Sequence, residues 1–302
     1  MKRRRSKHFG VSAGERIFNF FNILFLLVFA FICIYPFYFV IIGSVSTGPN
    51  SRQAYFWPIE FSLKIYKQLL SKSSIYNAFL ITTMRTVFGT ILTVFCSSLL
   101  AYLVTQEKMY FRKFVYRFFI LTMYIGAGLI PWYLVMRAYG FQNSFFLYII
   151  PGIVSPYFIM LVKTYIESLP KALEESAEID GAGFFTIFFR IIFPLCKPIV
   201  STITVFNAVG QWNSWRDNFF LVTKPQLQTL QLMLYKYLND AALLATAMRS
   251  GNTVGSESAA LMLTSESMRM AVIVISIIPI MLIYPFLQKY FAKGIMMGAI
   301  KG

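Results

Sequence analysis

Charged side chains are scarce in this sequence of 302 residues: Asp, Glu, Lys and Arg together make up 13% of it, about half the share of an ordinary soluble domain. A soluble protein needs polar side chains to cover its surface, so the shortage argues against one. The apolar residues, 57% of the chain, come in long uninterrupted blocks, which is typical of membrane proteins. This hydrophobicity, with 32 Phe, excludes intrinsic disorder.

Histidine and cysteine are also rare. His8 is the only histidine and lies in a basic tail, which argues against a histidine-based zinc site or catalytic triad. Cys33, Cys96 and Cys196 suggest no disulfide framework. The phosphate-binding pattern GxxxxGK[ST] does not occur, so the chain does not bind ATP by that device. We therefore expect a non-catalytic membrane subunit with no metal site and no cofactor.

The formal net charge of +16 could suggest a nucleic-acid partner. The basic residues, however, lie between the apolar blocks rather than in one patch, so they predict membrane topology and no nucleic acid.

Six apolar blocks predict six transmembrane helices and an all-α, polytopic membrane fold, because a span must satisfy its own backbone hydrogen bonds. The first block follows a basic tail at 1–16 and is too long for a signal peptide, so we expect an uncleaved span. The predicted spans are 17–43, 86–106, 118–136, 138–162, 198–215 and 270–288.

Lys and Arg set the predicted orientation. With a cytoplasmic N-terminus, the inner segments carry 17 basic residues in 78 positions and the outer segments 10 in 102. The inner density is higher, which predicts that both termini are cytoplasmic.

The inner loop 163–197 is unusual. Five of the twelve acidic residues fall between Glu167 and Asp180, and a very apolar run from Phe184 to Phe193 follows. We expect two short helices joined by a turn at Asp180-Gly181, with Pro194 ending the second. A plain solvated loop would not explain an apolar helix too short to span. A docking element against another protein would.

This loop resembles the EAA loop of binding-protein-dependent ABC importer permeases. The matching residues are Glu175, Ser176, Ala177, Asp180, Gly181, Ala182, Phe188, Ile191, Pro194, Leu195 and Pro198. The spacing from Asp180 to the two prolines is similar to that of the carbohydrate branch, the maltose-type permeases. Ser176 departs from the usual Ala, but a small residue still fits. The segments 276–280 and 284–302 also resemble this branch, particularly its complex-oligosaccharide importers, and the likeness covers 75–302.

The resemblance implies a type I ABC importer permease core at 75–302, with the coupling loop at 163–197. It implies a second permease subunit in a heterodimer, two cytoplasmic ATPase subunits, an extracytoplasmic solute-binding protein and an oligosaccharide substrate. Glu175 would pair with a basic group of the ATPase, and Gly181 would permit the tight turn. The other coupling positions would be Ser176, Ala177, Asp180, Ala182, Phe188 and Pro194. The C-terminal tail would contact the ATPase.

Polar residues follow one face of the predicted fifth span: Thr204, Asn207, Gln211 and Trp215, three or four positions apart. They could line the sugar pathway, with amides bonding hydroxyls and Trp215 stacking on a ring. They could equally hold helices together by interhelical hydrogen bonds. Both possibilities stay open.

Other polar and aromatic features lie towards the outer side. Arg85, at the outer end of an apolar stretch, could be functional, but we expect it to reach the outer interface. Trp57 and Trp132 fit an interfacial aromatic belt. The outer segment 211–270 is too long for a simple connector. Its middle, 239–267, could probe the external binding protein or be a disordered insertion.

We conclude that the chain is one membrane subunit of an ATP-driven oligosaccharide importer in a bacterial cell membrane. One alternative is the same machine carrying an amino acid or peptide. A stand-alone ion-coupled transporter would require acids within the spans, and none is found there. A membrane enzyme is the remotest alternative, because catalytic clusters are missing.

Overall fold

The computed structural model describes residues 13–46, 54–249 and 267–282, and helices dominate throughout these ranges. The chain divides into two compact units, one made of 1–65 with 254–274 and the other of 66–253 with 275–302. The predicted basic tail 1–16 lies largely outside the described residues.

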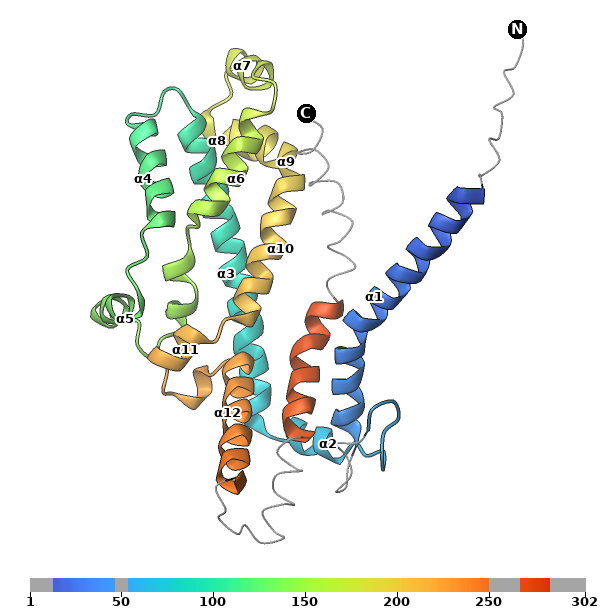
Figure 1. Ribbon diagram of the computed structural model, residues 1–302. Coiled ribbons are helices and arrows are strands. Elements are labelled where there is room, and N and C mark those ends of the chain that lie inside the picture. The colour runs from blue at the N-terminus through green and yellow to red at the C-terminus, as the bar shows by residue number, and fades with distance from the viewer. Residues whose placement is uncertain (1–12, 47–53, 250–266, 283–302) are drawn as a thin grey trace. The chain divides into compact units, whose positions relative to one another are not determined.

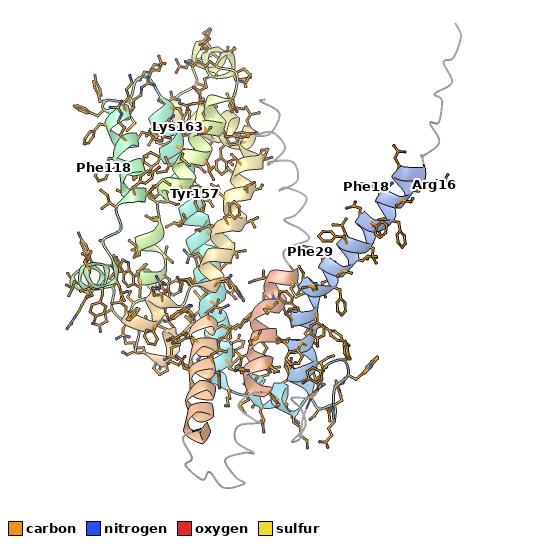
Figure 2. The ribbon with its side chains drawn as sticks, viewed as in Figure 1. Arg16, Phe18, Phe29, Phe118, Tyr157 and Lys163 are labelled. Carbon is orange, nitrogen blue, oxygen red and sulfur yellow. The ribbon has the colours of Figure 1, made fainter. Side chains whose placement is uncertain are left out.

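The first unit is built on α1 (Ala13–Val45), whose sequence carries no charge between Arg16 and its end. Phe18 is 69% exposed and, like Phe29, projects from the helix (Figure 2). Such apolar exposure suits lipid or a partner helix rather than water. Pro36 lies inside α1 and removes one backbone hydrogen bond; the helix is bent (Figure 1).

The chain closes back on the end of α1 within this unit. Ser62 N donates to Val45 O at 2.9 Å, and Ser46 forms an isolated antiparallel bridge with Phe61. The Tyr38 hydroxyl donates to Phe56 O at 2.6 Å. These bonds fix the segment that leads into α2 (Lys64–Leu70).

The second unit is organised around α3 (Ser73–Thr105), against which α6 (Pro156–Glu167) and α10 (Lys197–Asn213) pack (Figure 1). Small polar residues on α3 let the backbones approach. Thr93 Oγ1 donates to Gly152 O at 2.7 Å, and Ser97 Oγ accepts from Ser155 N at 3.1 Å. Such bonds hold membrane helices together where water is absent.

The predicted third span, 118–136, is wrong as a continuous helix. The chain forms α4 (Arg112–Tyr124) and α5 (Leu129–Ala138), separated by four non-helical residues. Gly126 and Gly128 lie in this break, and Gly128 has φ +81°, a conformation that ends a right-handed helix.

The predicted fourth span, 138–162, is also interrupted. Two short 3-10 helices, η2 (Phe145–Tyr148) and η3 (Ile150–Gly152), precede α6 and meet it at 44°. Pro151 and Pro156 explain the break, because each lacks an N–H and restricts the residue before it.

The segment after α6 lies at one end of this unit and comprises α7 (Ala172–Ile179), α8 (Phe184–Ile187), the π-helical turn η4 (Phe188–Ile192) and α9 (Phe193–Leu195). The run 184–195 meets α10 at a bend of 79°. Because α10 begins at this bend, it alone corresponds to the predicted fifth span, 198–215.

At the opposite end of the unit lie α5, α11 (Arg216–Leu221) and α12 (Leu230–Arg249), with the 3-10 turn η5 (Pro225–Leu227) between the last two (Figure 1). The predicted outer segment 211–270 is therefore helical over much of its described length, and 250–266 lie outside the described residues. Of the sixth predicted span, 270–288, the structure describes the helix Ser267–Leu282.

Two described helical stretches are long and apolar enough to cross a membrane, 14–45 and 73–105. Two bent pairs, 145–152 with 156–167 and 184–195 with 197–213, would raise the number to four if each is one span. The described residues thus give an all-α fold with membrane-spanning helices.

Candidate functional site

The segment 163–197 forms a helix, a tight turn and a second helix. Asp180 ends α7, and Gly181 follows with φ +78°, in the left-handed region that glycine adopts without strain. Ala182 N donates to Ala177 O at 2.9 Å, which closes the turn. Ile179, at its tip, is 86% exposed. The turn is rigid at its base and accessible at its tip.

Two of the three α7 glutamates hold the helix to the end of α3. Glu174 Oε2 accepts from Gln106 Nε2 at 3.2 Å, and Glu178 Oε2 pairs with Lys108 Nζ at 2.8 Å. Glu175 is exposed and has no ion pair among the residues that the structure describes. Of the three α7 glutamates, it is the one whose carboxylate has no bond within the described residues.

Aromatic stacking anchors the second helix to α3. The ring of Tyr102 stacks on Phe184 at 4.7 Å between centroids and on Phe188 at 5.4 Å. Phe188 is fully buried, and Ala177 of α7 belongs to the same hydrophobic cluster. Because the rings pack against α3, a displacement of this segment would either move α3 with it or break the stacking.

Pro194 was expected to end the second helix, and this is wrong, since the helical run continues to Leu195. The π-helical turn explains it. Phe193 N donates to Phe188 O, five residues back, so the ladder is already reset just before the proline, which has no N–H to satisfy. Cys196 lies at the bend that follows, and burial raises the pKa of its thiol to about 12.

A cavity of about 710 Å³ opens between the end of α3, the loop after it and the turn 181–183. Its wall includes Tyr102, Lys108, Glu178 and Phe184. Lys108 and Glu178, which pair with each other, supply the charged part of this wall.

The polar residues of α10 face α3 and the neighbouring elements. Thr204 Oγ1 donates to its own helix at Val200 O, and Asn207 Nδ2 donates to Gly89 O of α3 at 3.5 Å. Gln211 Oε1 accepts from Arg85 Nε at 3.0 Å. The bonds of Asn207 and Gln211 to α3 are those that the interhelical alternative predicts, whereas the bond of Thr204 stays within α10. Passage of a solute along this face stays a prediction.

Trp215 lies beyond the end of α10. Its indole stacks on Tyr235 of α12, with centroids 4.2 Å apart and planes 13° from parallel. The structure thus fixes Trp215 by stacking on α12, whereas Asn207 and Gln211 bond to α3.

Arg85 does not reach the outer interface, and that expectation is wrong. Its side chain is 4% exposed and forms a two-fold ion pair with Asp217, Nη2 to Oδ2 at 2.6 Å and Nη1 to Oδ1 at 3.1 Å. The guanidinium also lies over the ring of Tyr148, 4.7 Å from its centroid. The carboxylate of Asp217 on α11 neutralises the guanidinium, so Arg85 need not extend to water to stabilise its charge.

The sequence analysis missed this cluster. Asn218 Nδ2 donates to the Tyr148 hydroxyl, which itself donates to Leu227 O at 2.6 Å, while Asn218 Oδ1 accepts from Thr229 N at 3.1 Å. The signal that could have found it is the scarcity of acids: Asp217 is an isolated carboxylate, four residues after the end of α10, among apolar neighbours that favour pairing with a cation.

The described residues contain no group of three or more His, Cys, Asp and Glu side chains arranged to hold a metal ion. The rest of the chain lies outside this observation.

Comparisons with known proteins cover almost the whole chain. No family model matches it. The chain is 33% identical to the polygalacturonan/rhamnogalacturonan transport system permease protein YtcP of Bacillus subtilis, over 95% of this chain and 99% of that protein. It is 28% identical to the melibiose/raffinose/stachyose import permease protein MelC of the same organism, over 88% of this chain and 91% of that protein.

A solved structure is also similar. It is the crystal structure of a bacterial ABC transporter involved in the import of the acidic polysaccharide alginate, with a TM-score of 0.81 and 29% sequence identity. The match covers 93% of this chain and 98% of the matching chain.

Proposed function

Because this chain belongs to the family of ABC transporter permease proteins, in its carbohydrate branch, we propose that it is one of the membrane subunits of an ATP-driven oligosaccharide importer. The observation that carries the proposal is the full-length match to sugar permeases. Membership of this family supports a location in the bacterial cell membrane and a role as a transport component.

The partners in this proposal are a second permease subunit, two cytoplasmic ATPase subunits and an extracytoplasmic solute-binding protein. The chain would cross the membrane six times with both termini in the cytoplasm. The crossings would be α1, α3, the interrupted segment 118–136 from α4 into α5, the bent segment ending in α6, α10 and the helix 267–282. The Lys and Arg distribution supports this orientation.

The coupling element of the proposal is the segment 163–197, with α7 docked on an ATPase subunit. The exposed, unpaired carboxylate of Glu175 supports this, because it is free to pair with a basic group of the ATPase. The stacking of Tyr102 on Phe184 and Phe188 supports the next step. Movement of the docked helix would carry α3 with it as a rigid body and shift the bundle between two open states.

The C-terminal segment 283–302 lies outside the described residues. We propose contact with the ATPase for it on the sequence resemblance alone.

The test is ATP-driven uptake by vesicles that contain the assembled transporter, with Glu175→Ala and, as a matched control on the same helix, Glu178→Gln. Glu175→Ala should lower uptake on the order of 10-fold or more, because it removes a charged contact to the ATPase. Glu178→Gln should leave uptake within about 2-fold, since it breaks only an exposed internal pair. Equal effects of the two variants would contradict the docking role.

The same vesicles distinguish the substrate classes. Import of oligosaccharides but not of amino acids or short peptides supports the proposal. Import of peptides alone would replace it with the rival permease function, and uptake without ATP would point to an ion-coupled transporter.

A further inference from the structure

A cavity of about 680 Å³ lies at the end of the second unit formed by α5, α11 and the end of α10. One wall is the non-helical break before α5 together with Trp132. The other is Asn213, Ser214, Trp215, Arg216 and Asp217. The volume lies within the range typical of small-molecule sites. On the proposed topology, this cavity is on the extracellular side.

Two indoles provide the apolar surface of the cavity. One face of Trp215 is occupied by Tyr235, which holds the ring in place. Trp132 packs partly against the cluster that contains Leu221 and Tyr148. Both indoles are partly exposed at the cavity. Fixed aromatic rings offer flat apolar faces at little cost in conformational entropy, and sugar rings present C–H faces of matching shape.

Of the two charged side chains that line the cavity, Asp217 and Arg216, only Arg216 keeps an unpaired charge. Asp217 is already neutralised by Arg85 through two short contacts, and its Oδ1 also accepts from Ser214 Oγ at 3.2 Å and Asn218 N at 2.9 Å. Arg216 is exposed, and the described residues provide no ion-pair partner for it. An unpaired guanidinium matches a carboxylate in charge and in two-fold geometry.

Asn213 completes the polar set. Its Oδ1 accepts from Gln231 Nε2 at 3.2 Å, which orients the amide and leaves its two N–H groups as donors. Hydroxyl oxygens of a sugar accept such bonds.

From this combination we propose that the cavity is an extracellular-side subsite for an oligosaccharide that carries a carboxylate group. Arg216 binds the carboxylate, Trp132 and Trp215 contact ring faces, and Asn213 donates to a hydroxyl. The proposal rests on the importer function above and narrows it to an acidic saccharide. Trp132 then serves the ligand as well as the interfacial belt.

The test measures binding to the assembled transporter in nanodiscs, without the solute-binding protein. The probes are a galacturonic acid trimer and the same trimer with its carboxylates reduced to alcohols, and the readouts are calorimetry and tryptophan fluorescence. The acidic trimer should bind on the order of 10-fold more tightly than the reduced one. Arg216→Gln should abolish this difference, Arg216→Lys should keep part of it, and raised salt should shrink it.

Arg137→Gln is the matched control, because Arg137 is also exposed and basic, lies on α5 and does not line the cavity. It should keep the preference for the acidic trimer. Equal binding of the two trimers, no binding of either, or an unchanged preference in Arg216→Gln would overturn the proposal. Import of neutral oligosaccharides in those cases would leave the importer function standing.

Lipid phosphate offers the same anionic chemistry, so each measurement is repeated with and without phosphatidylglycerol in the nanodiscs. An effect of Arg216→Gln that appears only with anionic lipid and is equal for both trimers would assign Arg216 to lipid headgroups and overturn the sugar subsite.

Discussion

At one end of the second unit, Lys108 and Glu178 pair with their side chains 79% and 44% exposed, whereas at the other end Arg85 and Asp217 pair at 4% and 15% exposure. The first pair stays in contact with solvent and contributes little to stability. The second is surrounded by Gln211 and Tyr148 and cannot lose one partner without leaving a buried charge. The first pair lies on an accessible surface of the unit, and the second fixes the arrangement of α3 and α11 at the other end.

Among the variants that test this difference between the two ends, removal of one buried charge should lower the stability of the fold most. Arg85→Met leaves Asp217 without its cation and should destabilise the fold by about 3–5 kcal/mol. The measurement is the thermal midpoint of the purified transporter in detergent. The double variant Arg85→Met, Asp217→Asn should recover part of the loss, because no charge is left unpaired. A single variant as stable as the wild type would contradict the role assigned to the pair.

A glycine comparison at the α7–α8 turn should give the next largest effect. Gly181 has φ +78° and Gly183 has an ordinary φ of −74°, and neither would place a new Cβ against another atom. Gly181→Ala should cost about 1–2 kcal/mol through backbone strain alone, and Gly183→Ala should cost much less. Uptake and thermal stability measured on both variants separate strain from loss of a docking surface. Equal costs would contradict the strain argument.

Breaking the exposed pair should have a small effect. Lys108→Ala should change stability by less than about 1 kcal/mol, and the difference from wild type should vanish in high salt. Thermal midpoints at low and high ionic strength provide the check. A loss comparable to that of Arg85→Met would erase the distinction between the two ends.

The smallest effect concerns Cys196 at the bend into α10. Its pKa is raised to about 12 by burial, so the neutral thiol contributes stability that is present below its unfolded pKa near 9 and is lost as pH rises towards 12. At pH 8, a maleimide should label a Cys33→Ser, Cys96→Ser background only after unfolding. Rapid labelling of the folded transporter would show that the bend is open.

The sequence predicts those elements that local composition determines. A helix lies where the fifth apolar block predicts one, as α10 (Lys197–Asn213), and the left-handed turn at Gly181 lies at the predicted Asp180-Gly181 pair. The predicted third span is not one continuous helix, although it is apolar, because Gly126 and Gly128 interrupt it. Apolar content alone therefore does not establish that a helix is continuous.

Long-range pairings were beyond the sequence analysis. Arg85 and Asp217 are 132 positions apart, and no local pattern links them. The cavity beside Arg216 depends on that pairing, because only the neutralisation of Asp217 leaves the site cationic. The exposure of Glu175 likewise depends on which face of α7 packs against the unit, and the bonds of Glu174 and Glu178 to the segment after α3 show that face only in the folded chain.

The most direct test of the coupling account is cross-linking from the exposed tip of the α7–α8 turn. Ile179→Cys, in a background without the three native cysteines, is treated with a short bifunctional reagent in vesicles that are actively importing sugar. The account predicts a product with the ATPase subunit whose yield changes when ATP is added, and no labelling by an impermeant reagent from outside. Labelling from outside, or the absence of any ATPase product in active vesicles, would contradict it.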